Sequence, residues 1–200
     1  MKLAAKVVGL TGGLGCGKST VRRMWESLGV PCTDADAVAR DIHQNPHHAA
    51  VAEIARVFPQ AMTADGRLNR GSLRSLFAID ATANAKLKKI LAPHVIASMQ
   101  QWTMEQAALY VVWESALLIE EKIAVDRLVV VDTNTHLQLA RIVKRNPDWS
   151  AAQINSVLAM QLGRQDRLIF ADDTICNDSS LASLEEKAQA LHANYLQRWT

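Results

Sequence analysis

The sequence predicts an α/β fold, in which helices cover both faces of a doubly wound parallel sheet. Short apolar runs rich in Val, Ile and Leu alternate with longer amphipathic stretches along the chain. Near-continuous apolar character is typical of strands that are covered on both faces. No internal repeat, low-complexity segment or Pro/Gly/Ser-rich linker divides the chain.

Five apolar runs are predicted as strands, the last of them the weakest: Val7–Leu10, Val30–Thr33, Tyr110–Trp113, Leu128–Val131 and Thr174–Cys176. Helical spacing is found in Lys18–Leu28, Ala37–Ile42, Asn84–Gln106, His136–Arg145, Ala151–Gly163 and Leu181–Arg198. Ser180 is placed to cap the last helix. Pro93 should break or kink the helix around it, because proline removes an intrahelical donor.

The bulk composition excludes several classes of protein. Of 200 residues, 49% are hydrophobic, which is ordinary for a globular chain. A net charge of +2 is too small to indicate a nucleic-acid or anionic-membrane surface. No segment approaches the roughly 20 apolar residues that a bilayer span needs. Three widely spaced cysteines favour a reducing compartment, and we expect a cytoplasmic protein.

The sharpest local signal is the segment Gly12-Gly13-Leu14-Gly15-Cys16-Gly17-Lys18-Ser19, which fits G-x-x-x-x-G-K-[ST] between a strand and a helix. Its glycines allow successive backbone N–H groups to point inward and bind phosphate, and the following helix adds its positive dipole end. The Lys18 ammonium is expected on the β- and γ-phosphates and the Ser19 hydroxyl on Mg²⁺. The alternative, a glycine-rich turn that binds nothing, is disfavoured by the placement between strand and helix. The fold is therefore predicted to be of the P-loop NTPase type.

Acidic residues follow two of the predicted strands. Asp34 and Asp36 follow the second strand, where a carboxylate could accept the proton of an alcohol acceptor or could cap the next helix. Asp132 ends the strand 128–131, where it could bind Mg²⁺ or cap the strand end. The residues alone leave both pairs of alternatives open.

At this level of detail the chain resembles the bacterial dephospho-CoA kinases. The resemblance runs in order through Leu10–Gly13, Gly15–Thr20, Asp34–Asp36, Ala39-Arg40, Asp65–Arg70, Leu73, Phe77, Leu117–Glu120, Val129–Asp132, Gln138-Leu139-x-Arg141, Arg145, Gln161-x-x-Arg164, Arg167, Ala171-Asp172 and Ile175-x-Asn177. It covers nearly the whole chain. The sequence departs from the family pattern at Ala116, where Pro is usual, and at Ala92, where His is usual.

The resemblance implies transfer of the ATP γ-phosphate to the ribose 3′-hydroxyl of dephospho-CoA, the last step of coenzyme A synthesis. It implies that the catalytic residues are Asp36 as general base, Lys18 and Arg141. ATP would be bound by Gly13, Gly15, Cys16, Gly17, Lys18, Ser19, Thr20 and Asn177, and Mg²⁺ by Ser19. Dephospho-CoA would contact Thr11, Asp36, Arg70, Leu117 and Leu118. Arg145, Arg164 and Arg167 either reach phosphates or only solvate helix faces.

The resemblance also implies a division of labour within one domain. Residues 1–40, 110–137 and 168–200 would form the nucleotide-binding core, 41–109 a helical substrate-binding sub-domain, and 138–167 a mobile helical lid. We expect a monomer that binds no nucleic acid and no membrane. Two alternatives stay open: another small-molecule P-loop kinase, acting on a nucleoside-like or cofactor substrate, and a nucleotide-gated regulatory protein without acceptor chemistry.

Overall fold

The computed structural model describes residues 5–80 and 82–200, and only the backbone of Arg70, Arg74, Ala78 and Ile79. The chain divides into two compact units, one made of residues 1–33 and 106–200 and the other of residues 34–105. The first unit carries the sheet, apart from the last residue of one edge strand, and the second is built from helices.

The sheet has the strand order β2-β3-β1-β4-β5. Its strands are β1 (Lys6–Thr11), β2 (Cys32–Asp34), β3 (Tyr110–Glu114), β4 (Arg127–Asp132) and β5 (Asp173–Cys176). The pairs β1–β3, β1–β4 and β4–β5 are all parallel, with Leu10 opposite Glu114 in the first pair. The predicted doubly wound parallel sheet is confirmed, and it brings the carboxyl ends of β1, β3 and β4 together at one edge.

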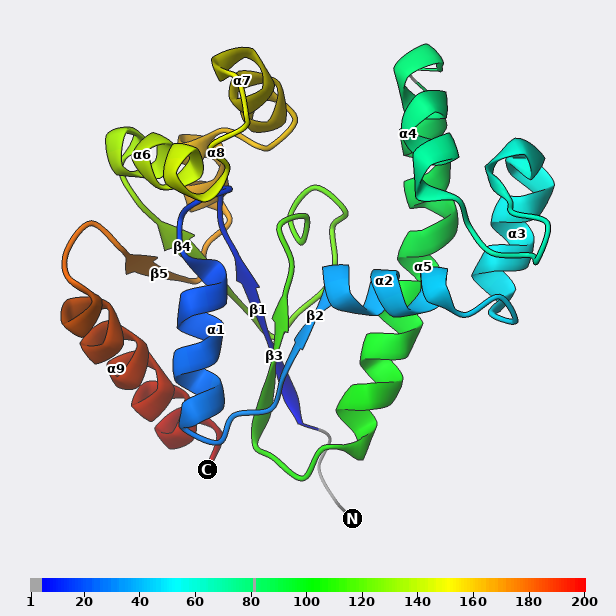
Figure 1. The fold of residues 1–200 in the computed structure, drawn as a ribbon. Helices are drawn as coiled ribbons and strands as arrows, with labels where there is room; N and C mark the ends of the chain where they lie inside the picture. Colours follow the sequence, from blue (N-terminus) through cyan, green and yellow to red (C-terminus); the bar gives the residue numbers. More distant parts are fainter. Residues whose placement is uncertain (1–4, 81) are drawn as a thin grey trace. The chain divides into compact units, whose positions relative to one another are not determined.

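The helices of the first unit are α1 (Lys18–Ser27), α6 (Thr135–Arg145), α7 (Ala151–Ala159), α8 (Arg164–Ile169) and α9 (Leu181–Trp199). Figure 1 shows α1 and α9 side by side, whereas α6 and α8 lie beyond the carboxyl ends of β1 and β4. Trp25 of α1 is fully buried, and its indole N–H donates to the carbonyl oxygen of Ala188 at 2.9 Å. This α1–α9 layer packs on alternate strand residues such as Val8 and Val129, which burial of apolar surface stabilises.

The second unit contains α2 (Ala35–Gln44), α3 (Ala49–Val57), a 3₁₀ turn η1 (Pro59–Ala61), α4 (Arg70–Ile79) and α5 (Ala83–Glu105). The long helix α5 packs against both α2 and α3. Of the two outcomes expected at Pro93, a break or a kink, the break is wrong, because α5 continues through Pro93. Buried residues recur every four positions, from Leu87 to Met99, and this packing holds the helix together across the missing donor, whereas Pro93 is exposed.

Several boundaries differ from the sequence prediction, and two of the differences have a clear structural cause. The strand β2 begins at Cys32 rather than Val30, since Val30 N still bonds the carbonyl oxygen of Trp25 at 3.0 Å and closes the end of α1. The helix α7 ends at Ala159 rather than Gly163, because the amide of Leu162 leaves the helical pattern and donates to Glu120 Oε1 at 3.1 Å. A short helix, α8, follows that the sequence did not predict.

Candidate active site

The glycine-rich loop connects β1 to α1, as predicted. Gly17 is the N-cap residue of α1 with φ 100°, a left-handed conformation that favours glycine. A side chain there would also meet Asn177, since a Cβ would lie 2.4 Å from Asn177 Nδ2. Instead, this amide donates to the carbonyl oxygen of Cys16 at 2.8 Å. The buried Asn177, at the end of β5, therefore fixes the last turn of the loop.

The Lys18 ammonium lies back over the loop that precedes it. Its Nζ donates to the carbonyl oxygens of Gly12 at 2.8 Å and Gly13 at 3.2 Å. Cys16, which belongs to the same loop, has a buried side chain, and this burial raises the pKa of its thiol. Cys16 can thus offer its backbone N–H to a phosphate while its side chain stays a neutral part of the core.

Around this loop lies a cavity of about 220 Å³, and every residue that lines it belongs to the first unit. Its lining is Leu14, Gly15, Gly17, Lys18, Ser19, Thr20, Arg23, Arg141 and Arg145. None of these side chains is acidic, and four of them are basic. The structure therefore gathers six of the residues predicted for nucleotide and phosphate handling around one cationic cavity, which suits a polyanion.

The hydroxyl of Ser19 has an acidic partner that the sequence did not reveal. Ser19 Oγ donates to Glu114 Oε1 at 2.8 Å, and the other oxygen of Glu114 accepts from Arg22 Nε at 2.6 Å. Glu114 is the last residue of β3, and only 5% of its surface is exposed. The available signal was an acidic residue directly after a buried apolar run, the same signal that drew attention to Asp132.

Asp132, at the end of β4, forms an ion pair with Arg164. Its two carboxylate oxygens accept from Arg164 Nε and Nη2 at 2.8 and 2.6 Å, and its side chain is buried. This bidentate pair raises the pKa of Arg164 above its ordinary value. Neither interpretation made from the sequence, a metal ligand or a strand-end cap, describes this ion pair. The ion pair also shows that Arg164 does not merely solvate a helix face, which was one of the two alternatives for this residue.

The segment 138–167 contacts the loop through side-chain amides. Gln138 Nε2 donates to the carbonyl oxygen of Leu14 at 2.8 Å, and Gln161 Oε1 accepts from the amide of Leu14 at 3.0 Å. Arg141 Nη2 donates to the carbonyl oxygen of Asn177 at 3.0 Å. Arg167 is buried and donates to the carbonyl oxygen of Leu162 at 2.6 Å, so it too is not a solvated surface residue.

The other predicted site residues lie in different surroundings. Thr11 is buried, and within the described part of the chain its hydroxyl has no hydrogen-bond partner. Leu118 is buried close to Gly9 of β1, and Leu117 is half-buried. The side chain of Arg70 lies outside the described residues.

In the second unit, the two aspartates occupy distinct positions at the start of α2. Asp34 is the N-cap residue, and its Oδ1 accepts from the amide of Asp36 at 2.9 Å. Asp36 itself lies in the first turn with an exposed side chain. The capping interpretation therefore holds for Asp34, which leaves Asp36 as the candidate base.

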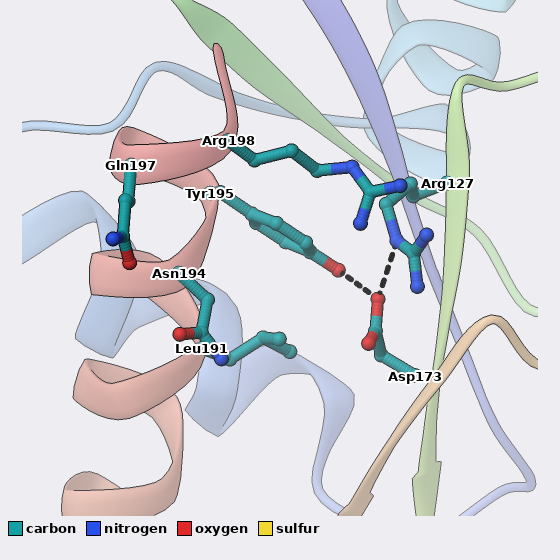
Figure 2. A pocket seen from close by; sticks show the side chains of 7 residues that line it. All are labelled: Arg127, Asp173, Leu191, Asn194, Tyr195, Gln197 and Arg198. Carbon is teal, nitrogen blue, oxygen red and sulfur yellow. Dashed lines mark hydrogen bonds and ion pairs between the residues drawn. The ribbon is translucent and has the colours of Figure 1, made fainter. Parts of the chain in front are cut away.

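A second cavity, of about 270 Å³, lies at the opposite, amino-terminal end of β4 and β5 (Figure 2). In it Asp173 Oδ2 accepts from Arg127 Nε at 2.7 Å and from the hydroxyl of Tyr195 at 2.6 Å. Burial opposes the charge on Asp173, but these two donors outweigh it and lower the pKa of the carboxyl. The contacts join α9 to the strand ends, and we interpret this cavity as structural.

The loop, its cationic cavity and the strand order define a P-loop kinase fold. A solved structure called TT1252, from Thermus thermophilus, has a TM-score of 0.81 and 26% identity, over 96% of this chain and 98% of that one. Two further structures share the fold: a dephospho-CoA kinase from Campylobacter jejuni, with a TM-score of 0.64 and 20% identity over 96% and 98% of the two chains, and a shikimate kinase from Acinetobacter baumannii, with a TM-score of 0.51 and 19% identity over 97% and 94%.

A family model described as dephospho-CoA kinase matches residues 6–183. A dephospho-CoA kinase from Methylococcus capsulatus is 39% identical over 94% of this chain and 96% of its own length, and one from Sodalis glossinidius is 36% identical over 95% and 92%. The chain belongs to the dephospho-CoA kinase family, whose members are phosphotransferases. None of the helices in the described ranges has the length and apolar character that crossing a membrane requires.

Proposed function

We propose that this chain transfers the γ-phosphate of ATP to the ribose 3′-hydroxyl of 3′-dephospho-CoA, giving coenzyme A and ADP. The observation that carries the proposal is the cationic cavity at the loop, in a chain that matches the family model over residues 6–183. In the reaction the 3′-oxygen forms a bond to the γ-phosphorus. The bond from that phosphorus to the β–γ bridging oxygen breaks, and ADP leaves with the electron pair.

The loop residues would supply most of the positioning. The N–H groups of Gly13 to Lys18 can bind phosphate oxygens, and the Lys18 ammonium, now held by two loop carbonyl oxygens, can turn to the β- and γ-phosphates. Arg141 and Arg145 line the same cavity from α6 and can neutralise charge that develops on the transferred group. In this scheme Thr20 adds a further donor at the start of α1, and Asn177 supports the loop near the adenine.

The residues around Ser19 fit a magnesium ion in chemical type. A hydroxyl and a carboxylate are oxygen donors, the type of ligand that Mg²⁺ prefers. The described residues contain no group of three His, Cys, Asp or Glu side chains that could hold a metal ion by itself. Bound Mg²⁺ would neutralise charge on the phosphates. Ser19 would be its ligand, and Glu114 would keep accepting the hydrogen bond from the Ser19 hydroxyl, which leaves the lone pairs of that oxygen for the ion.

The acceptor hydroxyl needs a base, and we assign that role to Asp36. The proton of the 3′-hydroxyl would pass to the Asp36 carboxylate as the 3′-oxygen attacks the γ-phosphorus. Thr11, Arg70, Leu117 and Leu118 are proposed to bind dephospho-CoA, residues 41–109 to form the substrate-binding part, and 138–167 to act as the lid. We further propose that the chain works as a monomer in the cytoplasm, where its three free thiols would stay reduced.

A coupled assay of ADP release, run with and without dephospho-CoA, tests the proposal. We expect ADP release that depends on dephospho-CoA and on Mg²⁺, with one CoA formed for each ADP. A panel of nucleosides and cofactor precursors serves as the control for acceptor choice. ADP release that is indifferent to dephospho-CoA, or a clear preference for another acceptor, would refute the assignment.

A further inference from the structure

Two adjacent arginines on α1 lie in different surroundings. Arg22 donates to Glu114 and Glu26, each at 2.6 Å, and so belongs to an acidic cluster. Arg23 lies about 100° further round the helix. It lines the cavity of about 220 Å³ at the loop, together with Lys18 and Thr20. No motif in the sequence drew attention to Arg23.

Within residues 5–80 and 82–200, no hydrogen bond or ion pair joins Arg23 to another residue, and the same holds for Arg145. Arg141, by contrast, donates to the carbonyl oxygen of Asn177. Among the described residues, none that lines the cavity carries a carboxylate. Arg23 is exposed, so water and salt screen its charge in part, but no carboxylate among the described lining residues competes with an anion for its guanidinium.

The position of Arg23 on the helix directs its side chain to the loop. It follows Ser19 by four residues and Thr20 by three, so these residues share one face of α1. Side chains on an α-helix tilt toward its amino terminus, and a long one covers the preceding turn. The guanidinium of Arg23 can therefore reach the entrance of the loop. Its planar fork of N–H donors matches two oxygens of a phosphate group.

We propose that Arg23 binds the phosphate chain of the donor nucleotide. It adds to the loop a second-turn arginine that the G-x-x-x-x-G-K-[ST] motif does not contain. The inference rests on the proposed function only in taking a nucleoside polyphosphate as the ligand, and it requires no acceptor.

Equilibrium binding of ATP and of ADP to the full chain, measured by calorimetry without acceptor, tests the proposal. Arg23→Gln removes the charge and replaces the guanidinium with a shorter, neutral amide, Arg23→Lys keeps the charge without the fork, and Lys144→Gln is the matched control. Lys144 is an exposed residue in the last turn of α6 that does not line the cavity. We expect Arg23→Gln to weaken both nucleotides about five- to tenfold, as for loss of a charge-assisted hydrogen bond at a partly exposed site.

Three further readouts sharpen the test. Arg23→Lys should recover part of the affinity, and Lys144→Gln should stay within about twofold of wild type. The affinity of Arg23→Gln should also depend less steeply on salt concentration, since one ionic contact is missing. In turnover assays KM for ATP should rise while kcat changes little, because the contact exists before and during transfer.

The proposal is overturned if Arg23→Gln binds ATP and ADP as wild type does, or if Lys144→Gln weakens them as much. If the wild-type chain binds neither nucleotide, this inference and the proposed function both fail. If it binds both nucleotides and Arg23→Gln is weakened, but dephospho-CoA accepts no phosphate, the proposed function fails and the role of Arg23 stands.

Discussion

Ser19, on the first turn of α1, donates its hydroxyl hydrogen to Glu114 at the carboxyl end of β3, with 2.8 Å between Oγ and Oε1. The bond fixes the direction of the hydroxyl, so that its lone pairs face away from the buried carboxylate. Arg22 holds the other oxygen of Glu114 and keeps the carboxylate in place.

This pair predicts an effect of Glu114 on magnesium. Glu114→Gln keeps an acceptor for Ser19 but removes the charge, so the gain in ATP affinity that Mg²⁺ provides should shrink about tenfold. Calorimetric titrations of ATP with and without Mg²⁺ measure this gain directly. Glu26→Gln, which loses only the second partner of Arg22, is the control and should behave as wild type. An unchanged magnesium effect in Glu114→Gln would separate Glu114 from the metal.

Lys18 is predicted to stabilise transferred charge rather than the fold. Lys18→Ala should lower kcat/KM by a factor of about 10² or more, as removal of preorganised charge does in other enzymes. The melting temperature should change little, because Lys18 lines the cavity and is only partly buried. Turnover close to the wild-type value in a folded variant would show that the charge is not used.

The two aspartates of α2 should separate in their effects. Asp36→Asn should lower kcat by a factor of about 10² to 10⁴ with little change in ATP affinity, since it removes the proposed base. Asp34→Asn keeps a good N-cap residue and should cost little stability, whereas Asp34→Ala should cost about 1 kcal/mol. Kinetics and urea unfolding of the three variants check this, and the reverse pattern would make Asp34 the base.

Hydrogen exchange can test residues 138–167 as a lid. Two arginines of this segment are not free charges, because Asp132 pairs with Arg164 and Arg167 is buried. Bound phosphates should nevertheless draw Arg141 and Arg145 inward, so exchange in 138–167 should slow when ATP and dephospho-CoA are both present. Arg141→Ala should reduce this protection and slow transfer. Equal protection with and without ligands would mean that the segment is not a lid.

Because the pKa of His192 is lowered in the folded chain, we expect the stability of the first unit to depend on pH. Its Nδ1 shares a 2.6 Å hydrogen bond with the hydroxyl of Tyr110, and burial lowers its pKa from the ordinary value. The unfolded chain therefore takes up a proton more readily. The stabilisation is complete above about pH 6.5 and is lost as the pH falls toward the lower pKa of the folded state. Urea unfolding of wild type and His192→Asn at pH 7.5 and 5.5 measures this, and the variant should lose less stability between the two.

The sequence by itself determined the parts of this protein that depend on neighbouring residues. The loop Gly12–Ser19, the buried strands and the Ser180 cap of α9 follow from local sterics, apolar runs and capping chemistry. Local patterns failed at two helix boundaries, where tertiary contacts prevailed. The helix α7 ends before Gly163, and α5 continues through Pro93.

Only the tertiary structure decided which acidic residue contacts the glycine-rich loop. Both strands beside β1 end in an acidic residue, Glu114 on β3 and Asp132 on β4, and the two share the same local signal. Ser19 contacts Glu114, whereas Arg164, far along the chain, pairs with Asp132. Strand order and the position of distant helices set these partners. Since such contacts join residues 32 to 95 positions apart, no local pattern encodes them.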